Sequence, residues 1–149
     1  EGIEAYSLIK HRHTSEIEEN LNLISGNQLQ ISFTPHLVPF VRGMLSTIYG
    51  RLKDPGLTSS DCKILLENYY RRFSNIKILP EDTLPSTKWA KYTNDIYISL
   101  KVDKRNGRII FISVLDNLLK GQAGQAIQNL NLISGLPMND GLNFSSFYP

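Results

Sequence analysis

The sequence holds a single cysteine, Cys62, so no disulfide can form within the chain. It has no apolar run long enough to cross a bilayer and no signal peptide. Its net charge is only +2, from 16 Lys and Arg against 14 Asp and Glu, and the cations are scattered. We therefore expect no membrane and no nucleic-acid partner. One thiol is typical of a reducing compartment, so we expect a cytoplasmic protein, with the plastid stroma as the alternative.

Several nucleotide and nucleophile motifs are also missing. No two glycines stand two residues apart, so there is no dinucleotide fingerprint, and there is no Gly-x-x-x-x-Gly-Lys phosphate loop. The Gly-x-Ser-x-Gly elbow of serine hydrolases is absent. Cys62 falls on the apolar stripe of a predicted helix, so we expect it in the core and not as a catalytic nucleophile.

The 149 residues are 41% hydrophobic and 20% charged, as in an ordinary globular domain. The clearest element is a hairpin, in which Ile96, Ile98, Leu100 and Val102 alternate with polar residues before the turn Asn106-Gly107. This order predicts an α+β fold with a mixed, largely antiparallel sheet and helices on one face. Strands are predicted over 5–10, 28–33, 43–52, 76–79, 88–92, 96–102 and 108–115, and helices over 15–24, 61–73 and 118–133.

Two of the three histidines, His11 and His13, flank Arg12 just before a predicted helix start. In an extended segment, residues two apart point to the same side, so both imidazoles could face one pocket. A helix N-terminus favours anions, and imidazoles move protons near neutral pH. A structural histidine pair is the alternative, while a metal site is not expected because no Cys, Asp or Glu cluster completes a ligand set.

Two further groups of residues are candidates for binding. His36 lies between Pro35 and Pro39, either as a rigid loop residue or as a site residue. Arg42 beside Gly43 could bind a carboxylate or phosphate, although this pattern alone favours a plain surface arginine. Gly121 and Gly124 stand inside a predicted helix at a cost of about 1 kcal/mol each, which indicates close packing of another helix or of a ligand.

Three segments together resemble one enzyme family, the N-acetyl-gamma-glutamyl-phosphate reductases. The similar segments are His11-Arg12-His13-x-x-Glu16-Ile17, Phe33-Thr34-Pro35-His36-Leu37-x-Pro39-x-x-Arg42-Gly43 and Asp116-Asn117-Leu118-x-Lys120-Gly121-x-Ala123-Gly124-Gln125-Ala126-x-Gln128-Asn129. They follow the family order and extend across most of the chain. Three departures stand out: Ser15 replaces a proline, Phe40 a methionine, and Tyr92 the usual glycine of a Gly-Ser/Thr-Asn loop.

The resemblance implies the C-terminal substrate and dimerisation domain, over residues 1–149, of an enzyme about twice as long. Such domains are shared with glyceraldehyde-phosphate and aspartate-semialdehyde dehydrogenases. The family's Rossmann domain, which binds NADP, and its nucleophilic cysteine are not among these residues, and the chain starts at Glu1 without methionine. We therefore expect a piece of a longer protein, inactive alone, whose helix over 116–135 contacts the missing domain.

The resemblance also implies a reaction and site residues. The family reduces N-acetylglutamyl phosphate to the semialdehyde with NADPH, in arginine biosynthesis. It makes His11 the acid/base candidate with His13 in support, and Arg12, His36 and Arg42 substrate-binding candidates. Asn117, Gly121 and Gly124 become NADP-binding candidates. A homo-oligomer is expected, and a non-catalytic homo-oligomerisation module is the alternative function.

Overall fold

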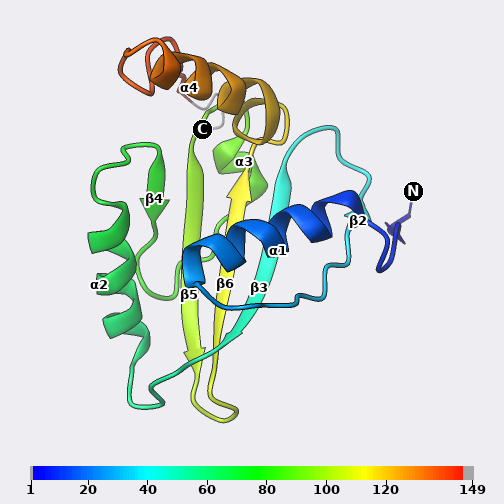
Figure 1. Cartoon of the computed structure of the whole chain (residues 1–149), viewed down its shortest axis with the longest axis vertical. Helices are drawn as coiled ribbons and strands as arrows, with labels where there is room; N and C mark the ends of the chain where they lie inside the picture. Colours follow the sequence, from blue (N-terminus) through cyan, green and yellow to red (C-terminus); the bar gives the residue numbers. More distant parts are fainter. Residues whose placement is uncertain (1, 146–149) are drawn as a thin grey trace. The chain divides into compact units, whose positions relative to one another are not determined.

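The structure, a computed structural model, describes residues 2–145, and the chain forms two compact units, Glu1–Val41 and Arg42–Pro149. Each unit contains one β-sheet (Figure 1). The predicted α+β class with a mixed, largely antiparallel sheet is confirmed. No helix within the described range is long and apolar enough to span a membrane.

The first unit combines one helix with a two-stranded ribbon. Strand β1 (Glu4–Ala5) pairs antiparallel with β2 (His36–Leu37), and α1 runs over Arg12–Ser25. The strand predicted over 5–10 is therefore wrong beyond Ala5, because Ser7 and Ile9 adopt left-handed φ angles of 48° and 66°. Such angles end a pleated strand.

The strand predicted over 28–33 is also wrong. The backbone N–H of Leu29 donates to Oδ1 of Asn22 at 2.6 Å, and that of Ile31 donates to Oε1 of Glu18 at 3.0 Å. Both acceptors belong to α1, so helix side chains satisfy the backbone groups that a strand partner would otherwise satisfy. This segment is therefore tied to α1 at Leu29 and Ile31 instead of pairing with another strand.

The second unit is built on a four-stranded sheet in the order β3-β6-β5-β4. All neighbours are antiparallel except β4 and β5. The strands are β3 (Met44–Arg51), β4 (Ile76–Ile78), β5 (Ile96–Asp103) and β6 (Arg108–Leu115). The predicted hairpin is confirmed, and Gly107 in its turn has φ 66°.

Helix α2 (Ser59–Tyr70) packs against β4 and β5 and closes the core. Its N-terminus carries a capping box, in which Thr58 and Asp61 each accept a backbone N–H of the other. Cys62 is 7% exposed and lies in the core with residues of β5 and β6, as predicted. Burial raises the pKa of its thiol, so the thiolate that a nucleophile needs is disfavoured.

The edge strand predicted over 88–92 is a short helix instead, α3 (Thr87–Ala90). The Ser86 hydroxyl caps it by accepting the backbone N–H of Lys88, and Tyr92 then turns the chain with φ 66°. The last predicted helix begins as one wide π-helical turn, η1 (Leu119–Ala123), and continues as α4 (Gly124–Ile133). Figure 1 places α3, η1 and α4 at the end of the sheet where β6 finishes and β3 begins.

Only one of the two glycines of this last helix is required by packing. A Cβ on Gly124 would overlap with Oδ1 of the buried Asn94 and would lie 2.9 Å from the backbone oxygen of Leu119. A Cβ on Gly121 would meet its nearest atom, in Leu115, at an ordinary 3.4 Å. The close neighbour of Gly124 is thus a loop of the same unit.

This difference predicts opposite outcomes for two matched substitutions. Gly124→Ala should lower the free energy of unfolding by about 1–3 kcal/mol, because Asn94 or the helix start must move. Gly121→Ala should change it by less than about 1 kcal/mol and in the stabilising direction, since alanine favours a helix. Urea unfolding of the two variants measures both values, and equal effects would contradict the packing argument.

Candidate active site

The histidine pair lies at the start of α1, but not in an extended segment. His11 is the N-cap, with φ −74° and ψ 131°, while His13 is already in the first helical turn. The two rings still lie together, with centroids 4.8 Å apart at 66°. The two rings lie together, as the spacing indicated, but His11 and His13 do not both lie in the extended segment that the argument assumed.

The ring of His11 caps the helix. The backbone N–H of His13 donates to Nδ1 of His11 at 3.1 Å. A nitrogen that accepts carries no hydrogen, so the neutral ring has its hydrogen on Nε2. The nitrogen that remains for exchange with a ligand is therefore Nε2.

Three aromatic rings fix the orientation of this imidazole. Tyr6 and Phe33 meet His11 edge to face, with centroids at 5.5 and 5.2 Å, and His13 is the third. Edge-to-face contacts of this kind are a preferred arrangement of ring pairs, so they restrict the orientation of the imidazole. The first turn of α1 contains no acidic residue, and Arg12 lies in it. The positive end of the helix dipole is thus left without a neutralising carboxylate.

His36 lies in β2 of the same unit and is exposed. Its Nδ1 lies 3.1 Å from the backbone oxygen of Thr34. Since a carbonyl can only accept, Nδ1 donates, and Nε2 is then an acceptor in the neutral ring. His36 and His11 thus present opposite nitrogen chemistry to a ligand.

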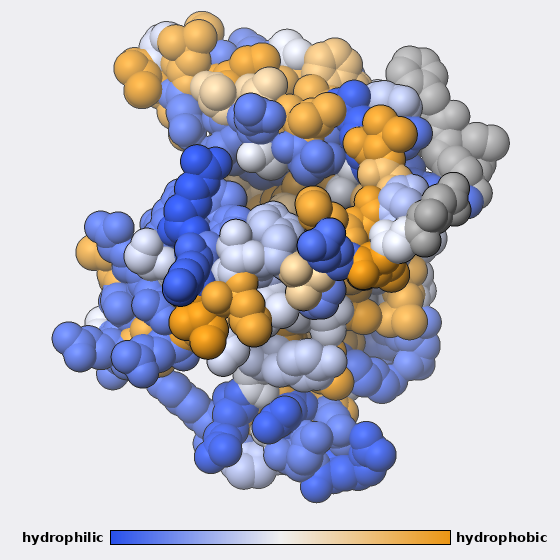
Figure 2. Space-filling view, turned by 90° about the vertical axis from the view of Figure 1, so that its right-hand side faces the viewer, coloured by the Kyte–Doolittle hydropathy of each residue, from blue (hydrophilic) through white to orange (hydrophobic). Residues whose placement is uncertain are grey.

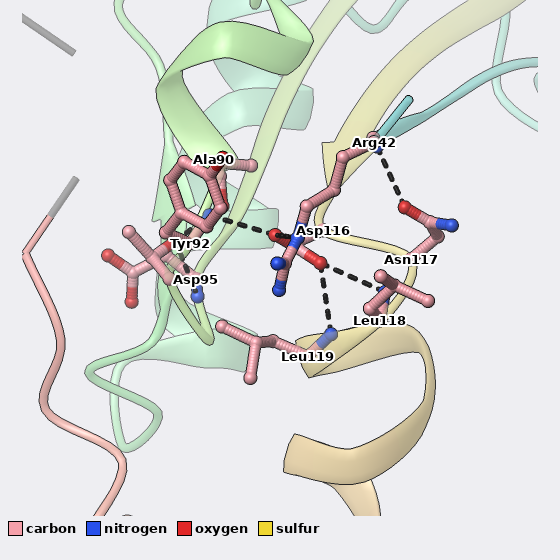
Figure 3. A network of polar contacts seen from close by, with 10 residues as sticks. Arg42, Ala90, Tyr92, Asp95, Asp116, Asn117, Leu118 and Leu119 are labelled. Atoms are coloured by element: carbon pink, nitrogen blue, oxygen red, sulfur yellow. Dashed lines mark hydrogen bonds and ion pairs between the residues drawn. The ribbon is translucent and has the colours of Figure 1, made fainter. Parts of the chain in front are cut away.

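The second unit contains a buried carboxylate to which the sequence analysis gave no role. Asp116 follows β6 directly and has 0% exposure. Its Oδ2 accepts from Nε of Arg42 at 2.6 Å and from the backbone N–H of Tyr92 at 2.8 Å. Its Oδ1 accepts from the N–H groups of Leu118 and Leu119 at 2.9 and 3.0 Å, as Figure 3 shows.

Four donors determine the charge state of this carboxylate. Burial alone would raise the pKa of Asp116, but the hydrogen bonds from Arg42, Tyr92, Leu119 and Leu118 outweigh it and hold the pKa below its ordinary value. Asp116 is therefore ionised at neutral pH and forms an ion pair with Arg42. The sequence signal for this role was an Asp-Asn pair between a strand and a helix, a position where Asp side chains cap backbone N–H groups.

Two predicted ligand-binding residues are held by this same turn. Arg42 bonds to Asp116, and next to it the backbone N–H of Gly43 donates to Oδ1 of Asn117 at 2.7 Å. Gly43 has φ 119°, a left-handed angle that favours glycine. Two consecutive residues before β3 are thus tied to two consecutive residues after β6.

Lys120 is a further unusual group near this turn. Its Nζ donates to Oε1 of Gln125 and of Gln128, both at 2.6 Å, and burial lowers its pKa. Gln128 continues to Asn139 at 2.7 Å. Lys120 therefore links η1 to α4 through neutral acceptors.

Across residues 2–145, no group of three or more His, Cys, Asp or Glu side chains could hold a metal ion.

Replacing Asp116 tests how much the fold depends on its carboxylate. Asp116→Asn should lower the free energy of unfolding by about 3 kcal/mol, since it leaves the Arg42 charge unpaired and turns an amide donor toward other donors. Because the folded pKa is lowered, the carboxylate stabilises the fold above its unfolded pKa, and this contribution is lost roughly from pH 5 downward. Urea unfolding at several pH values measures this dependence. Below about pH 5, the free energy of unfolding should fall less steeply with decreasing pH in the variant than in the parent chain.

Asp82→Asn is the matched control. Asp82 pairs with Lys101 at 2.5 Å, but the two side chains are 76% and 55% exposed. Asparagine also tolerates its left-handed φ of 62°. We expect this variant to unfold like the parent chain, and a loss equal to that of Asp116→Asn would contradict the role of burial.

Known proteins similar to this chain share one name. The chain is 68% identical over all 149 residues to the N-acetyl-gamma-glutamyl-phosphate reductase of Prochlorococcus marinus (strain MIT 9515), and 60% identical to that of strain MIT 9211. It spans 42% of the length of each of these relatives.

Solved structures extend the comparison to the fold. Aspartate semialdehyde dehydrogenase II from Vibrio cholerae matches with a TM-score of 0.68 at 17% identity, over 83% of this chain and 37% of that one. Residues 1–117 match the family described as "Semialdehyde dehydrogenase, dimerisation domain". The chain therefore belongs to the dimerisation-domain family of the semialdehyde dehydrogenases.

Proposed function

We propose that the chain is the C-terminal substrate and dimerisation domain of a cytoplasmic, NADP-dependent N-acetyl-gamma-glutamyl-phosphate reductase. The whole enzyme would reduce N-acetylglutamyl phosphate to the semialdehyde in arginine biosynthesis. The observation that carries this proposal is the 68% identity, without a gap in coverage, to a relative of that name. A Rossmann domain and a nucleophilic cysteine would come from the rest of a longer protein, since Cys62 is buried in the core.

His11 is the proposed acid/base residue. Its Nδ1 is committed to the helix N–H, so Nε2 is the atom that would exchange a proton or hydrogen bond with the substrate oxygen. The surrounding rings hold this imidazole in one orientation, which favours a fixed transfer geometry. His13, in ring contact with His11, supports that orientation.

The substrate of the proposed reaction carries a carboxylate and an acyl phosphate. Arg12 and His36 in the first unit and Arg42 in the second are the proposed anion-binding residues. Arg12 is supported by the unneutralised N-terminus of α1, which itself favours an anion. Arg42 is supported by its fixed guanidinium, since one side chain already holds its Nε.

The cofactor-binding proposal depends on Asn117. A backbone N–H faces its Oδ1, so the other side-chain atom, Nδ2, is left as a donor. Such a donor fits the carboxamide oxygen of a nicotinamide ring, and NADPH would supply the hydride when bound. Gly121 and Gly124 would allow a close approach of η1 to the cofactor, although the Cβ position of Gly124 faces Asn94.

Two apolar surfaces support assembly with other parts. On the edge strand β3, Leu45 and Tyr49 share one face and are 51% and 62% exposed, as suits a strand that packs against a second copy. On α4, Leu130 and Ile133 are 60% and 85% exposed, and Figure 2 shows apolar surface at the height of this helix. We assign α4 to contact with the N-terminal domain.

The isolated chain is expected to be dimeric and inactive. Light scattering should give twice the mass of one chain, and NADPH oxidation with acyl phosphate should stay at the level of a blank. A dimer with no turnover fits both the proposed domain and the alternative, a non-catalytic homo-oligomerisation module. Turnover that disappears in Cys62→Ser would overturn the proposal, because it would place the nucleophile in this chain.

His11→Asn in the longer enzyme separates the domain from the non-catalytic alternative. Asparagine is a preferred N-cap, so the variant keeps α1 capped while it removes the imidazole. We expect kcat to fall by about 10²–10⁴-fold with an unchanged melting temperature. His11→Ala, which removes the cap as well, should lose both activity and stability. Wild-type kcat in His11→Asn would show that the imidazole transfers no proton.

A further inference from the structure

Arg42 is held on two sides by groups from distant parts of the second unit. Its Nε donates to the buried Asp116 carboxylate at 2.6 Å. Its Cζ lies 4.7 Å from the centre of the Tyr92 ring, within the range of a cation–π contact. A guanidinium is planar, so a fixed Nε and a ring beside it leave few orientations for the rest of the group.

The two terminal nitrogen atoms of Arg42 are not used by this arrangement. Among the described residues, neither Nη donates a hydrogen bond, and the side chain keeps 19% of its surface exposed. A guanidinium carries five N–H donors, of which the carboxylate takes only the Nε–H. The remaining donors form the fork that binds carboxylates and phosphates in a bidentate way.

The Tyr92 backbone is in a conformation that favours glycine. Its φ is 66°, a left-handed angle that is rare for a bulky residue and is held here by its N–H bond to Asp116. Local backbone conformation therefore favours glycine at this position, and it gives no reason for a large aromatic side chain. Two cations lie against the ring, because Lys91 Nζ is 5.0 Å from the ring centre and Arg42 Cζ is 4.7 Å from it.

We propose that Tyr92 and Asp116 are positioning residues that hold Arg42 as a preoriented fork for an oxyanion of the substrate. This inference rests on the proposed function for the identity of the substrate. The ligand chemistry is a carboxylate or a phosphate group with two oxygens in one plane. In the proposed reaction both groups occur on one molecule, and the test below separates them.

The experiment measures anion binding to the chain itself, without turnover. The ¹⁵N-labelled chain is titrated with N-acetylglutamate in one arm and with inorganic phosphate in the other, and the Arg42 Nε–H signal is followed by NMR. Arg42→Lys identifies that signal by its loss. Followed through the backbone N–H signal of the neighbouring Gly43, this variant should no longer bind, because lysine keeps the charge without the fork. The arm with the lower Kd identifies the bound group.

Three substitutions of Tyr92 separate positioning from folding. Tyr92→Phe keeps the ring and is the matched control, with an unchanged Kd. Tyr92→Asn and Tyr92→Gly remove the ring and suit the left-handed backbone, so they should weaken binding by about three- to tenfold. Their melting temperatures should equal or exceed that of the parent, which a purely structural role of the ring does not predict.

Each other outcome overturns the inference. If the parent chain binds neither anion, Arg42 does not act as a fork. The same conclusion follows if Arg42→Lys binds both anions with the Kd values of the parent. If the ring-free variants bind like the parent, or lose affinity only in proportion to lost stability, Tyr92 does not position it. The proposed function has a separate readout. If the chain binds the anion as expected but the longer protein does not reduce N-acetylglutamyl phosphate, the proposed function is contradicted and the inference about Arg42 is supported.

Discussion

The second unit depends on the compensation of one buried negative charge. The carboxylate of Asp116 is fully excluded from water, so it is tolerated only because every lone pair that faces the protein meets a donor. These donors come from Arg42, two residues before β3, from the turn after α3 and from the start of η1. A single side chain thus fixes three segments that are far apart in the sequence.

The left-handed backbone conformation of Tyr92 is related to the same buried carboxylate. The N–H of residue 92 reaches the carboxylate only with this backbone turn, so the bond to Asp116 and the positive φ occur together. Glycine would satisfy the backbone equally well and would leave Arg42 without its ring. The left-handed conformation thus occurs together with the hydrogen bond to the carboxylate, while the side chain of Tyr92 lies against the guanidinium.

Sequence patterns predicted those parts of the fold and site whose partners are close along the chain. The hairpin of β5 and β6 follows from its alternation and its Asn-Gly turn, and the two-residue spacing of His11 and His13 indicated that their rings lie together, although the extended backbone assumed there is wrong. The patterns failed where another partner satisfied the backbone, as side chains of α1 do for the strand predicted over 28–33. Asp116 lies 74 residues from Arg42, and no periodicity links the two. A sequence shows which donors follow an aspartate, but not which ones fold back onto it.

The candidate site residues of the two units also differ in which contacts hold their side chains in place. The orientation of His11 depends on a helix N–H two residues away and on nearby rings, so it is set by local structure. The orientation of Arg42 depends on residues 92 and 116, which meet only when β3, β5 and β6 have paired. The anion recognition proposed for Arg42 would therefore depend on the folded sheet, since the guanidinium lacks both supports until that sheet has formed.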